Sequence, residues 1–481
     1  MRKHYSLSAL ILASCLLFAC GESAAPDMTA DLPDTTHTED SDSESLPASL
    51  PDRDFTGKKL RVVTSDEYAY QLYAPEQTGE VTNDAVYARN QYLEEKYNFE
   101  IESIINSANK FNWYTPIINT VLAGDDAYDL VGHFAYSACG AIVQNVYKNW
   151  LDIPYIDVDQ PCWNQNINDC ATINGKLYAI TGYLSTSVMQ STYAVFFNTR
   201  LAEEYGFDNE SLYDTVRSGK WTIDYFKSIT RDMYKDLDGD GKRGLADQYG
   251  YAVMPDTAPD IWLAAFNQPL TSIGNDGRIN IEINDDKTVS ALEKLLDMFY
   301  GGDGVINLET ITAYVSYYGD DFFAEGKSVF STSCLSSAYS KFRDMSDDYG
   351  ILTVPKWDEA QENYYTHIMD KYTIWGVPVT ETDDDFVGFV TEAICEESYR
   401  TVYPAFYDVA LKNKYSTDAG TAEMVDMLME GATFDFAFMF GDYCGKIQTM
   451  IREHIKNNNP DFASDFASRS FRLDELFEAY N

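Results

Sequence analysis

The sequence predicts an α/β protein with two lobes, each a mostly parallel sheet flanked by helices. Short apolar strands alternate with amphipathic helices from residue 59 onward, an order that produces parallel strands covered by helices. Residues 57–481 also have a globular composition, and a stretch of this length exceeds what one hydrophobic core normally holds. We therefore expect two lobes behind an N-terminal region of different character.

Residues 1–20 are typical of a lipoprotein signal peptide. Arg2 and Lys3 precede an apolar stretch, Tyr5–Phe18, that is too short to span a bilayer. Leu17–Cys20 is similar to a lipobox and predicts lipidation of Cys20, although Phe18 replaces the usual small residue. Cys15 is an alternative site, and a simple secretory signal is another interpretation. A lipid at Cys20 would anchor the protein at the cell surface without a membrane span.

Residues 21–56 are predicted to be a disordered acidic tether. They are rich in Ser, Thr, Asp, Ala and Pro, and Arg53 is their single basic residue. Such a segment buries too little apolar surface to fold, and its charge extends it. An interaction tail is the alternative. The whole chain has a net charge of −42, which disfavours nucleic acid as a partner and also suits the solubility of an exported protein.

The cysteines argue against a zinc site, because no C-x-x-C or Cys/His metal spacing is present. Cys162 and Cys170 are close enough in sequence to form a disulfide, and buried free thiols are the alternative. The remaining cysteines of the globular part are expected to be buried free thiols: Cys139, Cys334, Cys395 and Cys444.

The first lobe is predicted to begin with a strand at 59–64. Asp66, Tyr68 and Tyr70 follow at its carboxyl end, where ligands of α/β sheets bind, so they are cleft candidates; a plain surface loop is the alternative. A helix capped by Asn83 then runs to Asn98, and strands are expected at 99–104 and near 130.

The stretch from Asn174 to Gly206 gives a turn, a strand, a polar middle, a second strand and a helix. Its letters begin N-G-K-L-Y-A and continue through Y-A-V-F-F-N-T-R-L. This pattern resembles the first lobe crossing of the family 1 extracellular solute-binding proteins, the relatives of maltose-binding protein. The similarity extends from about residue 58 to the C-terminus, and it is strong at 350–361, which reads G-I-L-T-V-P-K-W-D-E-A-Q.

The resemblance implies a periplasmic-binding-protein-like fold whose lobes are joined by three hinge crossings. The F-x-x-G-K-x-x-F pattern at Phe323–Phe330 is expected to start the second crossing, and Thr373–Pro378 the third. The lobes are then expected to be residues 57–190 with 331–375, and residues 191–330 with 376–481.

Aromatic side chains are expected to stack on a sugar in the cleft, since a ring face presents its π-cloud to sugar C–H groups. The candidates, for each of which core packing or a surface position is the alternative, are Trp163 with its neighbour Asn164, Tyr193, Trp262 and Trp375. Trp221 is expected to pack in the core.

The segment Asp236–Asp247 has the pattern D-x-D-x-D-G-x-x-x-x-x-D, which predicts a structural Ca²⁺ site. Ca²⁺ binds six to eight oxygen ligands, and alternate residues of a tight loop supply them. The expected ligands are the side chains of Asp236, Asp238, Asp240 and Asp247 and the carbonyl of Lys242. An acidic turn without an ion is the alternative.

The implied function is capture of an extracellular sugar or oligosaccharide and its delivery to the permease subunits of an ABC importer. We expect a monomer held to the membrane only by its lipid anchor. We do not expect an enzyme, because no G-x-G-x-x-G, Walker, G-x-S-x-G or H-E-x-x-H motif is present. A binding protein for peptides or another solute, a secreted carbohydrate-active enzyme using a carboxylate pair, and an adhesion module remain alternatives.

Overall fold

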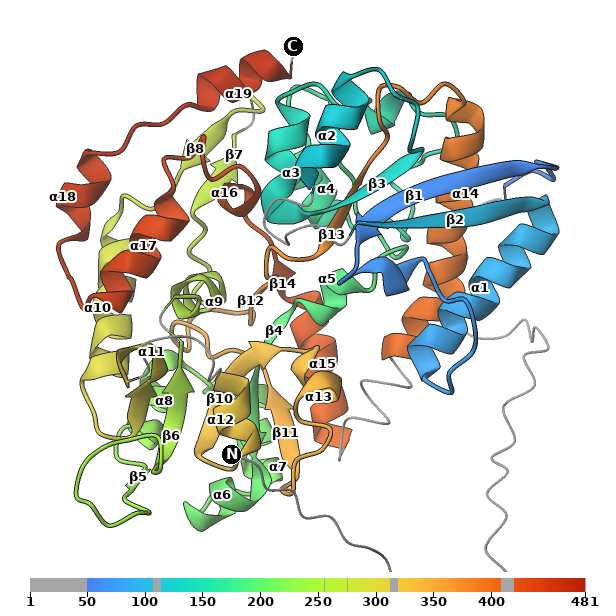
Figure 1. The fold of residues 1–481 in the computed structure, drawn as a ribbon. Coiled ribbons are helices and arrows are strands. Elements are labelled where there is room, and N and C mark those ends of the chain that lie inside the picture. The colour runs from blue at the N-terminus through green and yellow to red at the C-terminus, as the bar shows by residue number, and fades with distance from the viewer. Residues whose placement is uncertain are drawn as a thin grey trace, which may run out of the picture. The chain divides into compact units, whose positions relative to one another are not determined.

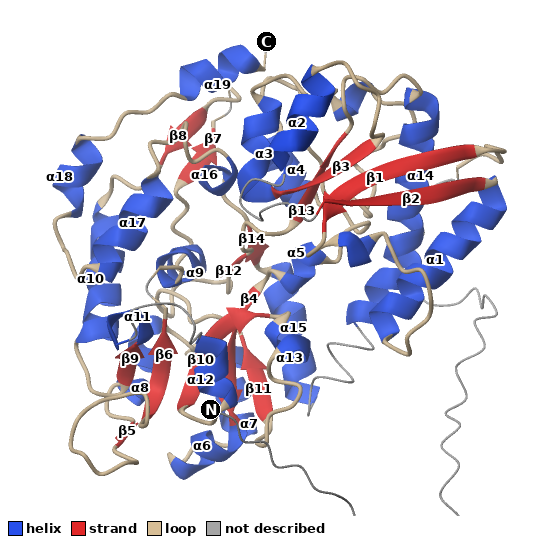
Figure 2. Cartoon of the chain, in the orientation of Figure 1, coloured by secondary structure: helices blue, strands red, loops and turns tan. Residues whose placement is uncertain are grey.

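A computed structural model describes residues 50–106, 114–254, 256–274, 276–311, 319–407 and 419–480. The predicted signal peptide with Cys15 and Cys20, and residues 21–49 of the tether, lie outside these ranges. Among the described residues, no helix has the length and apolar character needed to cross a membrane. The strands form two main groups, each with helices packed around it (Figure 1, Figure 2).

The first lobe is built on a four-stranded sheet with the order β13-β3-β1-β2. β1 is parallel to both β2 and β3, whereas β13 is antiparallel to β3. The central strand β3 is buried along its whole length, and Gly132 in it leaves room for the Trp375 ring, 2.7 Å from where a Cβ would lie. The strands are β1 (Lys58–Ser65), β2 (Phe99–Asn106), β3 (Leu130–Phe134) and β13 (Thr373–Gly376).

Helices of the first lobe come from distant parts of the chain, and α1 packs against α14 beside the sheet (Figure 1). The Glu80 side chain caps α1 by accepting the Asn83 N–H at 2.9 Å, so the predicted cap at Asn83 is three residues late. The elements are η1 (Ala69–Gln71), α1 (Val81–Tyr97), α2 (Tyr114–Leu122), α3 (Ala135–Ile142), η2 (Trp150–Asp152), α4 (Gln165–Ala171), α14 (Asp384–Glu397) and the π-helix η3 (Ser398–Val402).

The second lobe is built on a mixed sheet with the order β11-β4-β10-β6-β5, with β9 beside β6. β4 is antiparallel to β10 and β11, while β6 is parallel to β9 and β10. Asn198 and Thr222 cap helices of this lobe, since each accepts a backbone N–H at the start of its helix. The strands are β4 (Tyr193–Asn198), β5 (Tyr234–Lys235), β6 (Gln248–Val253), β9 (Val305–Asn307), β10 (Ser328–Cys334) and β11 (Tyr349–Leu352).

Smaller elements complete this lobe and its surroundings. The helices are α5 (Ser187–Gln190), α6 (Thr199–Glu204), α7 (Asn209–Arg217), α8 (Ile223–Thr230), α9 (Ala258–Ala265), α10 (Asp286–Tyr300), α11 (Leu308–Ile311), α12 (Gly319–Ala324), α13 (Ser337–Ser340), α15 (Ala419–Glu430), α16 (Phe436–Met439), α17 (Ile447–Lys456), α18 (Phe462–Ala467) and α19 (Leu473–Ala479). Two small sheets pair β7 (Thr271–Ile273) with β8 (Ile279–Ile281) and β12 (Thr366–His367) with β14 (Ala432–Thr433).

The predicted lobe boundaries are wrong in two places. Residues 331–352 were expected in the first lobe, but β10 and β11 pair with β4 in the second sheet. α14 was expected in the second lobe, but Phe386 and Phe389 pack on Phe55 of the first. The F-x-x-G-K-x-x-F pattern is therefore a helix, a turn and a strand within the second lobe, and no crossing starts there. The chain returns to the first sheet only at β13.

Three crossings between the lobes can be followed in the described residues. The first crossing runs from Gly182 through α5 to Thr192, and the second covers 368–372, between β12 and β13. The third begins after η3: Val402 packs in a first-lobe cluster, whereas Phe406 packs in the core of the second lobe. Residues 408–418 lie outside the described residues.

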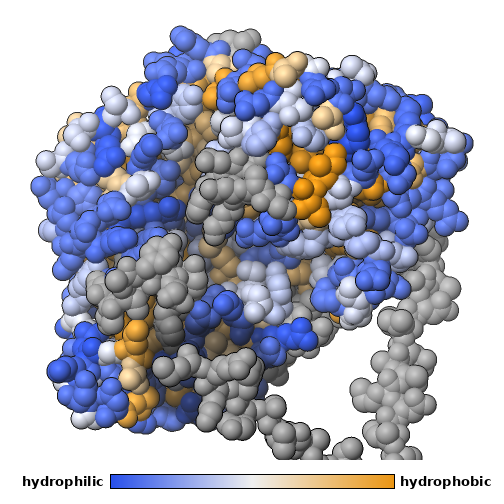
Figure 3. Space-filling view, viewed as in Figure 1, coloured by the Kyte–Doolittle hydropathy of each residue, from blue (hydrophilic) through white to orange (hydrophobic). Residues whose placement is uncertain are grey.

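The end of the predicted tether packs on the first lobe. Phe55 is buried, and its ring centroid is 5.1 Å from that of Phe386. Arg53 forms an ion pair with Asp385 at 3.2 Å. The boundary predicted at residue 57 is thus too late, because one aromatic side chain gives the acidic segment enough apolar surface to dock. Elsewhere the visible face is mostly hydrophilic, with small apolar areas (Figure 3).

A carboxyl group is buried in the core of the first lobe. Glu392 on α14 accepts a hydrogen bond from Trp163 Nε1 at 2.9 Å, and the Cys162 thiol lies 4.0 Å from its other oxygen. Burial raises the pKa of Glu392 to about 8. Cys162 and Cys170 are free thiols, and the Cys395 thiol donates to the carbonyl of Cys162 at 2.9 Å.

We predict that Glu392→Gln stabilises the protein at alkaline pH. The folded state binds the Glu392 proton more tightly than the unfolded state, so this group's contribution to stability is present at acidic pH and is lost as pH rises from about 4.5 to about 8. The amide keeps an acceptor for Trp163 and has no charge. At pH 8.5 the free energy of unfolding of the variant should exceed that of the wild type by roughly 1–3 kcal/mol, and its melting temperature should be higher. Near pH 5 the two proteins should have the same melting temperature. Exposed Glu95→Gln is the control; an equal difference at both pH values would contradict the prediction.

Candidate functional site between the lobes

The three tryptophans predicted to line the cleft lie in the lobe cores instead. Trp163, Trp262 and Trp375 are each at most 2% exposed. Trp262 packs against Phe226 and Tyr251, and Trp375 packs over Gly132. The prediction that they stack on a ligand is wrong, because protein atoms already cover both faces of each indole. Asn164 has a local role, since its side chain accepts the Ile167 N–H and caps α4.

The predicted tyrosines of the first lobe do reach the interlobe region. Tyr68 lies 5.0 Å from Phe134 and 6.3 Å from Tyr70, measured between ring centroids. Phe134 stacks on Tyr136 at 5.5 Å, so four rings form a row along the carboxyl ends of β1 and β3. Asp66 is exposed on the same loop. The structure thus brings Tyr68 and Tyr70 together with Tyr136, which the sequence argument from strand ends did not name.

A cavity of about 320 Å³ opens beside this row. The first lobe contributes Tyr70 and the start of α1, and the second contributes α13. The Tyr70 hydroxyl donates to the side chain of Gln190 in the first crossing. Burial raises the pKa of the Tyr339 hydroxyl on α13, and Tyr68 and Tyr70 are close enough to add to the shift. The cavity is lined by Tyr70, Glu80, Thr82, Asn83, Val86, Gln190, Tyr339, Arg343 and Phe406.

A polar group lies farther along the same region, and its members come from three distant segments. Arg452 on α17 donates from Nε and Nη2 to one oxygen of Asp260 on α9, at 2.8 and 2.6 Å. Burial raises the pKa of Asp260 to about 7, against the opposing effect of Arg452. Asp370 in the second crossing also has a pKa raised by burial, and it is close enough to influence Tyr136 and Tyr193 from the two lobes.

Tyr193, a candidate of the second lobe, lies close to Asp260 and Asp370. It is the first residue of β4, and its ring stacks on His367 with centroids 6.1 Å apart. Sequence reasoning missed Asp260, Asp370 and Arg452. Asp260 had a weaker signal than Asp66, because it lies within α9, whereas Asp66 directly follows β1. Arg452 had none, since it lies on a helix far along the chain.

The predicted calcium loop gathers three of its five proposed ligands. One carboxylate oxygen from each of Asp236, Asp238 and Asp240 lies within 4.8 Å of the others. Asp236 accepts the N–H groups of Gly239 and Gly241 at 2.6 and 2.9 Å, and both glycines have positive φ, which favours glycine.

The other two predicted ligands make contacts within the loop. Asp247 is buried and accepts N–H groups from Leu237 and Gly244 at 3.1 and 2.8 Å. The Lys242 carbonyl accepts the Tyr234 hydroxyl at 3.3 Å. The loop is thus folded as a compact turn with the first three carboxylates converging, while the oxygens at positions 7 and 12 hold the turn together.

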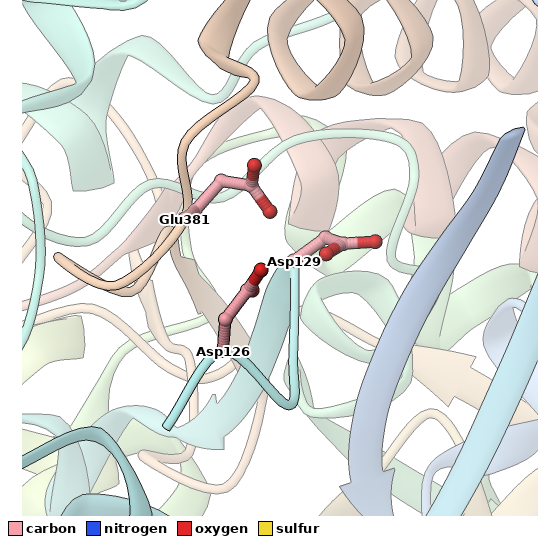
Figure 4. Close-up of side chains that lie close together, drawn as sticks. All are labelled: Asp126, Asp129 and Glu381. Carbon is pink, nitrogen blue, oxygen red and sulfur yellow. The ribbon is translucent and has the colours of Figure 1, made fainter. Parts of the chain in front are cut away.

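A second acidic group, Asp126, Asp129 and Glu381, lies in the first lobe (Figure 4). Arg61 on β1 supplies its positive charge: Nε donates to Asp129 at 2.8 Å, and the guanidinium lies 2.7 Å from Asp126. Burial and the neighbouring Asp129 carboxyl raise the pKa of Glu381 to about 7. This group is an ion network around one arginine.

Comparison with protein-family models gives no match, and comparison with curated protein sequences gives none either. Solved structures do match. An ABC substrate-binding protein from Listeria monocytogenes in complex with cycloalternan has a TM-score of 0.54 at 14% identity, over 88% of this chain and 99% of that one. The chain has the fold of the two-lobed ABC solute-binding proteins. The resemblance inferred from sequence is thus confirmed at the level of the fold.

Other solved proteins with this solute-binding fold are similar to the same extent. Maltose-bound MalE3 of T. maritima matches with a TM-score of 0.51 at 12% identity, over 88% of this chain and all of that chain. The cyclic α-maltosyl-1,6-maltose binding protein of Arthrobacter globiformis matches with a TM-score of 0.54 at 14% identity, over 88% and 98%. Similarity at these identities establishes the architecture, and the chemistry of this chain's own cleft must indicate the ligand.

Proposed function

We propose that this protein binds a sugar or oligosaccharide between its lobes, outside the cell, and delivers it to an ABC importer. The observation that carries the proposal is the pairing of a tyrosine-rich row with a polar group in one interlobe region. The row is Tyr68, Tyr70 and Tyr136, faced by Tyr339, and the polar group is Asp260, Asp370 and Arg452. The solved proteins with cycloalternan and maltose bound support a sugar as the ligand class.

Each part of the region has a role in the proposed mechanism. Tyrosine faces stack on sugar C–H groups, while carboxylates and the guanidinium form charge-assisted hydrogen bonds to hydroxyls. The ligand touches both lobes only when they are closed, so binding shifts the population toward the closed state. No step breaks a bond in the ligand, so the protein acts as a binder and has no catalytic residues.

Removing Tyr68 or Tyr70 of the row, or Tyr193 beside the polar group, should weaken sugar binding while the fold persists. We expect Tyr68→Ala, Tyr70→Ala and Tyr193→Ala each to lower affinity by ~1–3 kcal/mol, because each loses a stacking or hydroxyl contact. Isothermal titration against maltose, cycloalternan, tagatose and a set of di- and tripeptides would measure this. Tyr92→Ala on the exposed side of α1 is the control.

The same titration tests the proposed function itself. Binding of a sugar that is recovered unchanged supports it, and hydrolysis of the sugar would indicate an enzyme. Peptide binding without sugar binding would replace the ligand class. If all three tyrosine variants bind sugar like the wild type, the site lies elsewhere.

We further propose that Cys20 carries the lipid anchor. The lipobox-like sequence at 17–20 supports this, and the acidic residues after it suit a spacer. Cys20→Ser should release the protein from membranes into the medium in a detergent-partition assay, and Cys15→Ser should leave it bound. Release by Cys15→Ser alone would place the anchor at Cys15.

We also propose that the loop from Asp236 to Asp247 holds a structural Ca²⁺. Convergence of three carboxylates on a glycine-containing turn supports this, since a hard cation takes oxygen ligands. Asp236, Asp238 and Asp240 would bind it, with the Lys242 carbonyl and Asp247 completing the set. EDTA should lower the melting temperature by about 2–5 °C. Asp238→Asn should abolish that response and exposed Asp232→Asn should keep it; an EDTA-insensitive wild type would rule the ion out.

A further inference from the structure

One buried side chain touches two of the three crossings. Gln71 is the last residue of η1, and it is 1% exposed. Its amide nitrogen donates to the Thr373 hydroxyl at 2.8 Å, directly after the second crossing. Its amide oxygen accepts the Ser185 hydroxyl and the Ser187 N–H, both in the first crossing. Both ends of a single amide are thus used to hold the ends of two interlobe segments.

The two crossings are also bonded directly to each other around this amide. The Thr373 N–H donates to the Ser187 hydroxyl oxygen at 2.8 Å, and the hydroxyls of Ser185 and Ser187 are 2.7 Å apart. Thr181 donates to the Thr373 carbonyl at 2.8 Å. These two crossings are therefore held to the first lobe at one buried point.

Side chains of α1 hold the backbone of the turn that carries Gln71. The guanidinium of Arg89 on α1, which is fully buried, donates to the Gln71 carbonyl at 3.2 Å. Asn90 donates to the next carbonyl, that of Leu72, at 2.8 Å. The same turn carries Tyr68 and Tyr70 into the interlobe region, and Tyr70 reaches Gln190 in the first crossing. The proposed ligand-binding rings of Tyr68 and Tyr70 and the side chain of Gln71, which holds the two crossings, are therefore parts of one short segment.

We infer that Gln71 is a positioning residue that sets the balance between open and closed lobes. The inference rests on the proposed function, in which closure accompanies binding. Without the amide, the first crossing loses the link through Gln71 to the end of the second and keeps only the direct bonds from Ser187 and Thr181 to Thr373. The ligand-free lobes should then sample a wider range of openings. Binding weakens when the closed state is less populated, even though Gln71 touches no ligand.

The test compares Gln71→Leu and Thr373→Val with a matched control, Thr391→Val, in the full chain. The Thr391 hydroxyl is buried in α14 and has no hydrogen-bond partner among the described residues, so the control makes the same change away from the crossings. Small-angle X-ray scattering gives the radius of gyration without ligand and with saturating maltose or cycloalternan. Residues 1–49 are common to all variants, so differences report the lobes.

We expect Gln71→Leu and Thr373→Val to enlarge the ligand-free radius of gyration, to leave the saturated value unchanged and to weaken affinity about 5–30-fold. Thr391→Val should match the wild type in both radii of gyration and in affinity. A wild-type ligand-free radius for both variants overturns the inference, whatever their affinity, because a purely local packing role would not move it. If Gln71→Leu does not fold, Thr373→Val decides alone. A wild type that binds no sugar defeats the proposed function, while the ligand-free comparison still judges Gln71.

Discussion

The arrangement of the two lobes depends on the hydrogen bonds that hold the first crossing. The backbone from Gln190 to Thr192 is bonded on both sides: Leu335 and Ser336 donate to the carbonyls of Thr192 and Gln190, and Met369 donates to Ser191. Buried backbone groups must be paired, so this segment fixes where β10 ends and where the second crossing begins. Tyr193 follows at once, which places a site tyrosine at the join of the lobes.

Local signals predicted the elements well, and long-range pairing limited what followed from them. The strands at β1, β4 and β6, the caps Asn198 and Thr222, and the helix α10 follow from local pattern and capping chemistry. The lobe to which a strand belongs does not follow from local pattern. The apolar sequence of β10 would suit a strand in either sheet, and only its pairing with β4 shows that it belongs to the second lobe. Fold class was therefore predictable from the sequence, while the boundaries at 331 and 376 were not.

The candidate site also contains some residues that the local sequence can suggest and others that it cannot. Tyr68 and Tyr70 could be proposed from the sequence because they follow the carboxyl end of β1, and Tyr193 because it is an aromatic residue. The polar group could not be proposed, since Asp260, Asp370 and Arg452 become neighbours only after α9, the second crossing and α17 are folded together. Choosing tryptophans by their affinity for sugars failed for a physical reason. Trp163, Trp262 and Trp375 are buried in the lobe cores, where their large apolar surfaces contribute most to stability. Trp163 also donates the hydrogen bond that the buried Glu392 carboxyl needs.

Tyrosine suits an interlobe surface better than tryptophan does, because such a surface must be stable in two states. In the proposed open state, the row at Tyr68 and Tyr70 meets water, and the phenol hydroxyls can hydrogen-bond to it. In the proposed closed state, the same rings provide flat apolar faces for a ligand, and the Tyr70 hydroxyl bonds to Gln190 in the first crossing as it does in this structure. Burial raises the pKa of Asp260 and Asp370, so desolvating these carboxyls on closure opposes binding unless ligand hydroxyls replace the water. A ligand rich in hydroxyls satisfies that condition, whereas an apolar ligand would supply no hydrogen-bond donor to either acid.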